Sequence, residues 1–405
     1  MTDVATAPPF PMARECPMHP PAEYASLRAE RPIAPVTMPD GQRAWLVTKH
    51  KYARALLADP RVSSNRTHPA FPFLTEVDRA SLTRDDRPFT RSMLAQDPPV
   101  HTTHRRAVIT EFSVRKVQAM RPRIQQIVDE CVNAMLADGG PLDLVQALSL
   151  PVPSLVICEL LGVPYADREA FQRWTRVLVT RSSTTQERTA ASDRLTEYLD
   201  KLVSAKEAAP TDDLLGRLIA KNAQTPTMDH TELVAMATLL LIAGHETTAN
   251  MISLGVVALL ERPDELTELR DSPGILPQAI EEMLRYFSIV DAITARVALA
   301  DIEIGGVTIR AGEGLVVAVN AANWDDEVFA EPQRLDIHRS ARHHVAFGFG
   351  VHQCLGQNLA RAELEIVFET LFRRIPGLRL TVPAADLPYK DDANTYGVHE
   401  VPVTW

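Results

Sequence analysis

Cysteine is scarce in this chain of 405 residues, and its four cysteines stand far apart, at Cys16, Cys131, Cys158 and Cys354. Neither a disulfide framework nor a zinc site made from close cysteine pairs is therefore expected. Positive charge is also in short supply, because 42 lysines and arginines face 52 aspartates and glutamates, for a net charge of −10 at pH 7. That balance argues against nucleic-acid binding as the main task.

The first twenty residues lack the apolar run of a signal peptide and instead contain five prolines. We therefore expect an N-terminal arm over residues 1–20, followed by a single domain over residues 21–405. The expected location is the cytoplasm, with no membrane partner, and we expect a monomer.

One long apolar run does occur, from Leu233 to Leu260, and it is long enough to cross a bilayer. His245 and Glu246 interrupt it near its middle. An acidic residue at the centre of a membrane span costs roughly 2.5–3.5 kcal/mol. The run therefore predicts a helix buried inside a folded protein, over about Asp229–Glu261.

Helical periodicity dominates the chain, and short alternating runs mark small sheets. We expect a mainly α fold with small β-sheets, of the α+β class, without internal repeats. Polar stretches at 181–192 and 205–213 are expected to be exposed connectors. The predicted helices cover 21–30, 50–59, 100–112, 116–137, 229–261, 273–287 and 355–374, and the predicted hairpins cover 33–47 and 302–309.

A glycine-rich aromatic loop over 347–356, FGFGVHQCLG, places Cys354 at the start of a helix. A helix N-terminus favours a thiolate, so this position predicts a lowered thiol pKa and a soft anionic ligand. Two other interpretations are a buried structural cysteine and a zinc site with His344 and His352. The second lacks paired-ligand spacing.

This loop resembles the haem-binding signature of the cytochromes P450, Phe-x-x-Gly-x-x-x-Cys-x-Gly, which Phe347, Gly350, Cys354 and Gly356 satisfy. The resemblance extends from Pro32 to Trp405, and it is strongest to actinobacterial members that hydroxylate secondary metabolites and xenobiotics. It implies a haem b, an iron protoporphyrin IX, held between the long central helix and the helix after the cysteine. Cys354 would ligate the iron.

The polar interruption of the long helix, Ala243-Gly244-His245-Glu246-Thr247-Thr248, resembles the oxygen-activation site of the same family. The hydroxyl of Thr247 can bond back to the carbonyl of Ala243, which loosens the helix beside the iron. Gly244 is expected to keep that side uncrowded. The resemblance implies that Glu246 and Thr247 supply protons while the co-substrate O₂ is activated.

Two further sets of residues match the family. Glu282 and Arg285 match its Glu-x-x-Arg pair, with Arg334 as the expected third partner in a buried structural network. The haem propionates need cationic partners, and the resemblance assigns these to His101, Arg105, Arg296 and His352.

No flavin, dinucleotide or iron–sulfur pattern appears, so the electrons are expected to come from a ferredoxin with its NAD(P)H-dependent reductase. The expected docking patch consists of His104, Arg106, Arg115, Lys116, Arg339, Arg342 and His343. The expected substrate is a sizeable, mainly hydrophobic organic molecule such as a macrolide, statin-like or steroid-like compound or a xenobiotic. Its pocket would include Leu240, Ile289, Val290, Ile293 and Thr395, and Arg66, Arg84 or Arg87 would be available to a carboxylate.

The leading hypothesis is thus a haem-thiolate monooxygenase. Two alternatives remain open at this point. A haem-thiolate peroxygenase or nitric-oxide reductase would work without ferredoxin, and the intact Glu246-Thr247 pair argues mildly against the former. A non-catalytic haem or small-molecule binding protein would bind its ligand without turnover, and no attached output domain supports a sensor.

Overall fold

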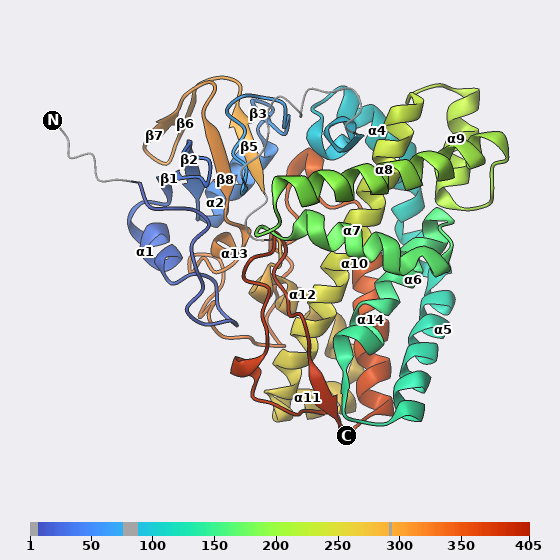
Figure 1. Cartoon of the computed structure of the whole chain (residues 1–405). Coiled ribbons are helices and arrows are strands. Elements are labelled where there is room, and N and C mark those ends of the chain that lie inside the picture. The colour runs from blue at the N-terminus through green and yellow to red at the C-terminus, as the bar shows by residue number, and fades with distance from the viewer. Residues whose placement is uncertain (1–6, 76–87, 291–293) are drawn as a thin grey trace.

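The computed structural model describes residues 7–75, 88–290 and 294–405, which form a mainly helical fold with small sheets (Figure 1). Two of the sheets gather with the N-terminal segment on one side, and most of the long helices lie together on the other side, where the C-terminal strand also lies. This arrangement confirms the predicted fold class. The main helices are α1 (Glu23–Glu30), α2 (His50–Ala58), α3 (Pro88–Arg91), α4 (Val100–Val108), α5 (Val114–Asp138), α6 (Pro151–Leu161), α7 (Arg168–Val179), α8 (Thr185–Ala208), α9 (Leu214–Gln224), α10 (His230–Leu260), α11 (Pro263–Asp271), α12 (Leu276–Phe287), α13 (Val319–Ala322) and α14 (Gln357–Arg374).

Helix α10 is the central element, and it packs against α6, α8 and α14. Its start is fixed by a capping box, in which Asp229 and Glu232 each accept a hydrogen bond from the other's backbone N–H. Most of its side chains between Leu233 and Leu259 are buried, as expected for a helix that is apolar on nearly every side. Among the helices of the described residues, none combines the length and apolarity needed to span a membrane.

A five-stranded sheet has the order β1 (Ile33–Thr37), β2 (Arg43–Val47), β8 (Gly314–Val317), β5 (Ala295–Ala298), β3 (Val62–Ser63). The predicted hairpin between β1 and β2 is present, and Gly41 in its turn has a φ of 79°, which favours glycine. The predicted hairpin of β6 (Ile302–Ile304) and β7 (Val307–Ile309) is also present. A third sheet has the order β4 (Leu142–Asp143), β10 (Pro402–Thr404), β9 (Arg379–Leu380).

The prediction of polar connectors at 181–192 and 205–213 was largely wrong, because α8 occupies 185–208. Thr184 accepts a hydrogen bond from the backbone N–H of Glu187, whose carboxylate accepts one from Thr184, so a capping box starts the helix. The stretch is polar because much of α8 faces solvent.

The N-terminal segment packs onto the rest of the chain from residue 7 onward. Phe10 is buried, and its backbone N–H donates to the carbonyl of Thr37. Farther along, the guanidinium of Arg14 lies 3.8 Å above the centre of the Tyr396 ring.

Candidate active site

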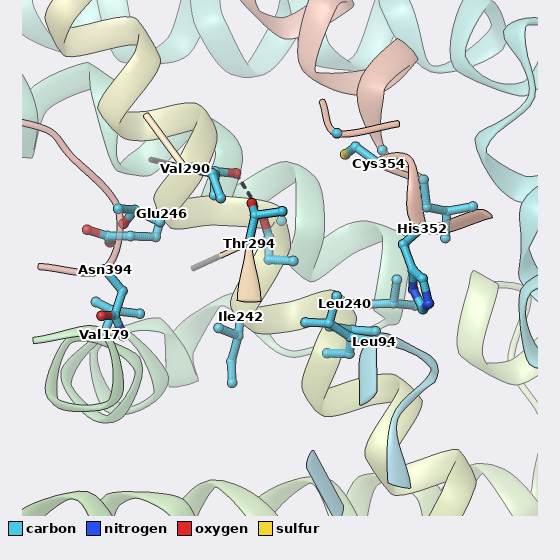
Figure 2. Close-up of a pocket in the computed structure, with 18 of the residues that line it drawn as sticks. Leu94, Val179, Leu240, Ile242, Glu246, Val290, Thr294, His352, Cys354 and Asn394 are labelled. Carbon is cyan, nitrogen blue, oxygen red and sulfur yellow. Dashed lines mark hydrogen bonds between the residues drawn. The ribbon is translucent and has the colours of Figure 1, made fainter. Parts of the chain in front are cut away.

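A cavity of about 660 Å³ lies beside the middle of α10 and is bounded by α7, α8, α14 and the loop that carries Cys354. In the view of Figure 2, Cys354 and His352 lie on one side of it, and Glu246, Val179 and Asn394 lie on the other. Segments far apart in the sequence thus meet at one space. The volume is in the range of small-molecule sites.

The cysteine loop owes its shape to glycines. Gly348 and Gly350 have φ values of 69° and 74°, which side chains rarely adopt. A methyl group on Gly350 would also overlap the backbone carbonyl of Leu57. Past this turn, the backbone N–H of Cys354 donates to the carbonyl of Phe347 at 2.7 Å, and Gly356 then caps α14.

Cys354 borders the cavity and is half-buried. Burial raises the pKa of this thiol, although the backbone N–H groups of Gly356 and Gln357 and the charges of Arg105 and Arg361 act in the opposite direction. The prediction of a lowered pKa was therefore wrong for the protein alone. A cationic ligand for the sulfur would be needed to favour the thiolate.

The zinc interpretation fails on geometry. His344 lies 3.2 Å from the carboxylate of Glu281. The described residues contain no group of three or more histidine, cysteine or acidic side chains arranged to hold a metal ion.

Four basic residues converge beside Cys354, as predicted. The rings of His101 and His352 are 4.1 Å apart between centroids. Arg105, one turn after His101 on α4, donates from Nη2 to the carbonyl of Gln353 at 2.7 Å. Arg296, from β5, lines the same cavity.

This cluster combines the positive charges of two arginines with two buried histidines that are neutral near pH 7, and it is poor in partners. Burial lowers the pKa of His101 to about 4, that of His352 to about 3 and that of Arg296 to about 10. Nδ1 of His101 and Nε2 of His352 are buried and have no hydrogen-bond partner among the described residues. Such a cluster suits a ligand that brings anionic oxygens.

On α10, the predicted bond is present, because Thr247 Oγ1 donates to the carbonyl of Ala243 at 2.9 Å, and the helix continues without a break from His230 to Leu260. Both residues line the cavity. The expectation for Gly244 needs correcting. Its missing side chain makes room for Ile157 of α6, since a Cβ there would lie 2.7 Å from the Ile157 side chain. This glycine therefore also serves helix packing.

Glu246 lines the cavity and forms an ion pair with Lys390, at 2.5 Å between Oε1 and Nζ. Burial alone would raise the pKa of Glu246, but Lys390 and His245 together outweigh burial and lower it. His245 itself is buried. Its Nε2 is hydrogen-bonded to the hydroxyl of Thr175 of α7 at 3.1 Å, and its Nδ1 donates to the carbonyl of Leu241 at 2.7 Å. His245 thus ties α10 to α7 and does not line the cavity, whereas its neighbours Glu246 and Thr247 do.

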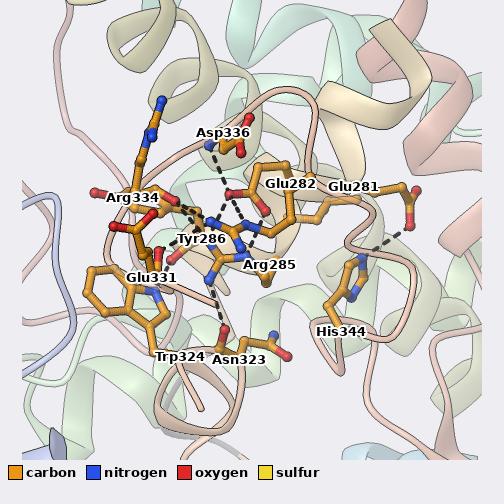
Figure 3. Close-up of polar contacts among 12 residues, drawn as sticks. Glu281, Glu282, Arg285, Tyr286, Asn323, Trp324, Glu331, Arg334, Asp336 and His344 are labelled. Carbon is orange, nitrogen blue, oxygen red and sulfur yellow. Dashed lines mark hydrogen bonds and ion pairs between the residues drawn. The ribbon is translucent and has the colours of Figure 1, made fainter. Parts of the chain in front are cut away.

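Glu282 and Arg285 of α12 form the expected ion pair, fully buried, with 2.7 Å between Oε2 and Nε (Figure 3). The backbone N–H of Asp336 also donates to Glu282, at 3.0 Å. Arg285 donates to the carbonyl of Asn323, whose side chain accepts from the backbone N–H of Val345. The network thus fixes the segment that leads into the cysteine loop.

The third partner of this network differs from the prediction. Among the described residues, Arg334 takes part through its backbone carbonyl alone, which accepts from Arg285 Nη2 at 3.3 Å, and its side chain is exposed. The guanidinium beside Glu282 belongs to Arg339, with 3.0 Å between Nε and Oε1. The sequence pattern found the right segment, but it could not show which arginine turns inward.

Comparisons with known proteins agree with this geometry. The family model for cytochrome P450 matches residues 47–272 and 274–391. The chain is a cytochrome P450. It is 51% identical over 404 residues to pentalenic acid synthase of Streptomyces avermitilis, covering 100% of this chain and 99% of that protein. It is 48% identical to vitamin D3 dihydroxylase of Streptomyces griseolus, covering both chains fully.

Solved structures give the same result. The crystal structure of cytochrome P450 MoxA from Nonomuraea recticatena, a CYP105 protein, has 54% identity and a TM-score of 0.89, with 98% of each chain covered. The mycinamicin VIII C21 methyl hydroxylase MycCI from Micromonospora griseorubida has 44% identity and a TM-score of 0.92, covering 98% of this chain and 100% of that one. This cytochrome P450 is therefore a monooxygenase of the group that includes these secondary-metabolite hydroxylases.

A cytochrome P450 implies a haem, and the residues present fit one. The unpartnered nitrogens of His101 and His352 and the arginines beside them suit two propionates. No atom would crowd a Cβ placed on Gly356, so the backbone beside Cys354 leaves room for a flat ligand. Phe347 lines the same space, beneath the guanidinium of Arg361 at 4.6 Å.

Two members of the predicted docking patch are not available on the surface of this cytochrome P450. His104 is 3% exposed and lies 3.7 Å from Glu232. Arg339 is held by Glu282. The other five side chains are exposed: Arg106, Arg115, Lys116, Arg342 and His343.

Of the predicted pocket residues, Leu240, Ile289, Val290 and Thr395 line the cavity. Ile293 lies outside the described residues, as do Arg84 and Arg87. Arg66 lines the cavity and is close enough to Arg296 for the two charges to repel, so it belongs with the basic cluster.

Sequence reasoning missed three residues of this site. Lys390 is 144 positions from its partner Glu246, so no local pattern could pair them. Arg188 lies in a stretch predicted to be an exposed connector. Glu363 of α14 is buried at the cavity with a pKa raised well above its ordinary value by burial, and only its i+4 spacing from Leu359 could have indicated an inward position.

Proposed function

We propose that this cytochrome P450 hydroxylates a sizeable, mainly hydrophobic organic substrate, with Cys354 as the iron ligand of haem b. One observation carries the proposal, namely that a single cavity joins the Cys354 thiol, a basic cluster and the Glu246-Thr247 step of α10. Apolar side chains dominate the remaining wall. Sizeable apolar cavities of this kind favour substrates with extended hydrocarbon surfaces.

When bound, the haem supplies the activation of O₂ and the insertion of one oxygen atom into a C–H bond. The chain supplies binding and protons. His101, His352, Arg105 and Arg296 would hold the propionates, and Cys354 would hold the iron. The hydroxyl of Thr247 donates a hydrogen bond to the Ala243 carbonyl, and its lone pairs stay free to accept a further hydrogen bond.

Glu246 is placed to relay protons to Thr247. Its carboxylate is ionised while Lys390 holds it. It would first take up a proton from solvent, and a turn about its side-chain bonds would then bring it beside Thr247, its neighbour on α10. This pair supports the monooxygenase over a peroxygenase, which needs no such supply. A nitric-oxide reductase or a binding protein would show no oxygenated product with ferredoxin, reductase and substrate present.

The names of similar proteins support this substrate class. One relative is named for pentalenic acid and another for vitamin D3, and MycCI is bound to mycinamicin VIII. We extend to this chain only their shared chemistry, a large and mainly apolar skeleton.

A ferredoxin with its NAD(P)H-dependent reductase is the proposed electron source. Arg106 and Arg342 are exposed and positively charged, which suits an acidic partner. Charge reversal of both to glutamate should slow reduction by ferredoxin at low salt. Unchanged rates would contradict this docking surface.

The absorption spectrum of the dithionite-reduced protein with carbon monoxide tests the central assignment. A thiolate-ligated haem shifts its main band far to the red. We expect this band in the wild type and in Cys16→Ala, the exposed-cysteine control, and its loss in Cys354→Ala. A band typical of histidine ligation in all three proteins would refute the assignment.

A further inference from the structure

A short segment near the C-terminus, residues 389–398, packs against α10 beside the cavity. We call it the C-terminal loop. Its two ends pair in an isolated antiparallel bridge, and the backbone N–H of Lys390 donates to the carbonyl of Gly397 at 2.9 Å. Gly397 lets the loop approach α10 closely, because a Cβ at this position would overlap Oδ1 of Asn250. The loop thus lies directly on the helix that carries Glu246.

Three residues of the C-terminal loop face inward. Nζ of Lys390 holds Oε1 of Glu246 at 2.5 Å and Oδ1 of Asn250 at 2.8 Å. Asn394 and Thr395 line the cavity, and Figure 2 shows Asn394 on the same side of it as Glu246. The position of the loop backbone therefore sets the distance between Lys390 and Glu246.

Two tyrosines of the same loop are the chain neighbours of these inward residues. Tyr389 precedes Lys390, and Tyr396 follows Thr395. Neither tyrosine lines the cavity. Their rings stack, with centroids 6.0 Å apart and planes inclined by 6°. The backbone N–H of Tyr396 also donates to the carbonyl of Ile289, a residue of the cavity wall, at 2.8 Å. A shift of this tyrosine stack would therefore move the inward residues through the backbone.

The N-terminal segment covers the tyrosine stack. The guanidinium of Arg14 lies 3.8 Å above the centre of the Tyr396 ring, as a cation–π contact. The hydroxyl of Tyr396 donates to the carbonyl of Pro17 at 2.6 Å. The hydroxyl of Tyr389 lies 3.6 Å from Sδ of Met18. Tyr396 is only 3% exposed as a result of this cover.

Arg14 also joins the stack to an anchored part of the fold. Its Nη1 donates to the carbonyl of His19 at 2.7 Å, which closes a loop over residues 14–19. The His19 ring packs edge-on against Trp324 and Tyr286, with centroids 5.2 and 6.3 Å apart. Both partners are buried. One side chain thus links the C-terminal loop to the aromatic core beside α12.

We propose that Arg14 is a positioning residue for proton supply, which acts through Tyr396 and the C-terminal loop to keep Lys390 on Glu246. The inference rests on the proposed function, in which Glu246 relays protons. It adds the N-terminal segment to that machinery, although this segment does not touch the cavity.

A pH effect follows, because the side chain of Glu246 is only 12% exposed. The titratable and charged groups that face it are Lys390 of the C-terminal loop, His245 of its own helix and Arg176 of α7. Burial raises the pKa of Glu246, and these groups together outweigh burial and lower it. A looser Lys390 would leave burial less opposed, so the pKa of Glu246 would rise.

The first measurement is the rate at which acetic anhydride acetylates Lys390 in the haem-loaded enzyme at pH 8, read by mass spectrometry. Pairing with a carboxylate keeps the amine protonated and unreactive. We expect Arg14→Ala to raise this rate at least threefold and Arg14→Lys, which keeps a cation above the ring, to restore most of the protection. Arg31→Ala, at an exposed arginine after α1, should leave the rate unchanged. Lys206, in a buried pair with Asp213, is the internal reference for an intact fold.

The second measurement is the pH profile of oxygen consumption with ferredoxin, its reductase and NADPH. We expect the acid limb of Arg14→Ala to move to higher pH, in the same direction as that of Lys390→Met. The double variant should move no farther than Lys390→Met alone, because both changes act on the same ion pair. A merely structural role of Arg14 would lower the rate at every pH without moving the limb.

Unchanged acetylation of Lys390 in Arg14→Ala would overturn the inference. So would acetylation of Lys390 and Lys206 that rises in parallel, or a double variant whose shift is the sum of the two single shifts. Acetylation does not depend on electron transfer or on the haem spectrum, so the two proposals fail separately. A selective rise for Lys390 without the red-shifted carbon monoxide band would contradict the proposed function alone.

Discussion

Replacing Arg339 by alanine should destabilise this cytochrome P450, whereas replacing Arg334 by alanine should not. The guanidinium of Arg339 is 12% exposed and pairs with the fully buried Glu282. It also donates to the backbone carbonyls of Ala330, Glu331 and Arg334. Arg334 contributes only a carbonyl, which an alanine keeps, and its side chain is in solvent.

The magnitude follows from what the truncation leaves behind. Glu282 keeps Arg285 and the backbone N–H of Asp336, so its charge stays partly compensated. The truncation removes one charge-assisted hydrogen bond to Glu282 and the donor to the Ala330 carbonyl, whereas the carbonyls of Glu331 and Arg334 keep the Arg334 N–H and Arg285 Nη2. About 2–4 kcal/mol is a reasonable total. An exposed substitution such as Arg334→Ala usually changes stability by less than about 0.5 kcal/mol.

Urea unfolding of the holoenzyme, followed by far-UV circular dichroism and by haem absorbance, measures both variants. We expect a lower midpoint for Arg339→Ala and an earlier loss of the haem signal, because the network fixes the segment leading to Cys354. A double variant with Glu282→Ala should lose less than the sum of the single variants. An Arg334→Ala variant as unstable as Arg339→Ala would refute the reasoning.

Three other outcomes are expected. Gly350→Ala should lose haem and about 2–3 kcal/mol of stability, since φ is positive and Leu57 blocks the methyl group; Gly274→Ala, with open space around it, is the control. For His230, Asp200 raises the pKa, so the ring should stabilise the fold below about pH 6.5 and cease to do so as the pH rises through its folded pKa. His230→Gln should remove this pH dependence from the melting curves, and an unchanged dependence would contradict the pairing. Lys390→Met should shift the acid limb of turnover to higher pH, because burial then raises the Glu246 pKa; Lys201→Met, an exposed pair member, should not.

Most of the fold was predictable from the sequence because its signals are local. The apolar run of α10, the glycine turns of both hairpins and the cysteine loop each carry their information within a few residues. Helix α8 was missed at its start for the opposite reason. Its first two turns are exposed and polar, and only the capping box of Thr184 and Glu187 marks them.

The position of a site residue was predictable where a local sequence motif contains that residue. Cys354, Thr247 and the basic cluster all lie where the pattern put them. The pairings of Glu246 with Lys390 and of Glu282 with Arg339 join segments 144 and 57 positions apart, and only the tertiary structure selects them. Arg334 and Arg339 are close in sequence, and only the folded structure shows that the side chain of Arg339, and not that of Arg334, is buried against Glu282.

The segment from Lys390 to Tyr396 connects proton supply with substrate recognition. Lys390 holds both Glu246 and Asn250 of α10, at 2.5 and 2.8 Å. Four residues later, Asn394 borders the cavity. Between these two points, the Arg181 guanidinium donates to the carbonyls of Asp391 and Ala393, which ties the two ends of the segment to one side chain. Arg181→Ala should therefore change substrate affinity and the pH dependence of turnover together, whereas Thr189→Ala, at a residue of α8 that lines the cavity, should change affinity alone.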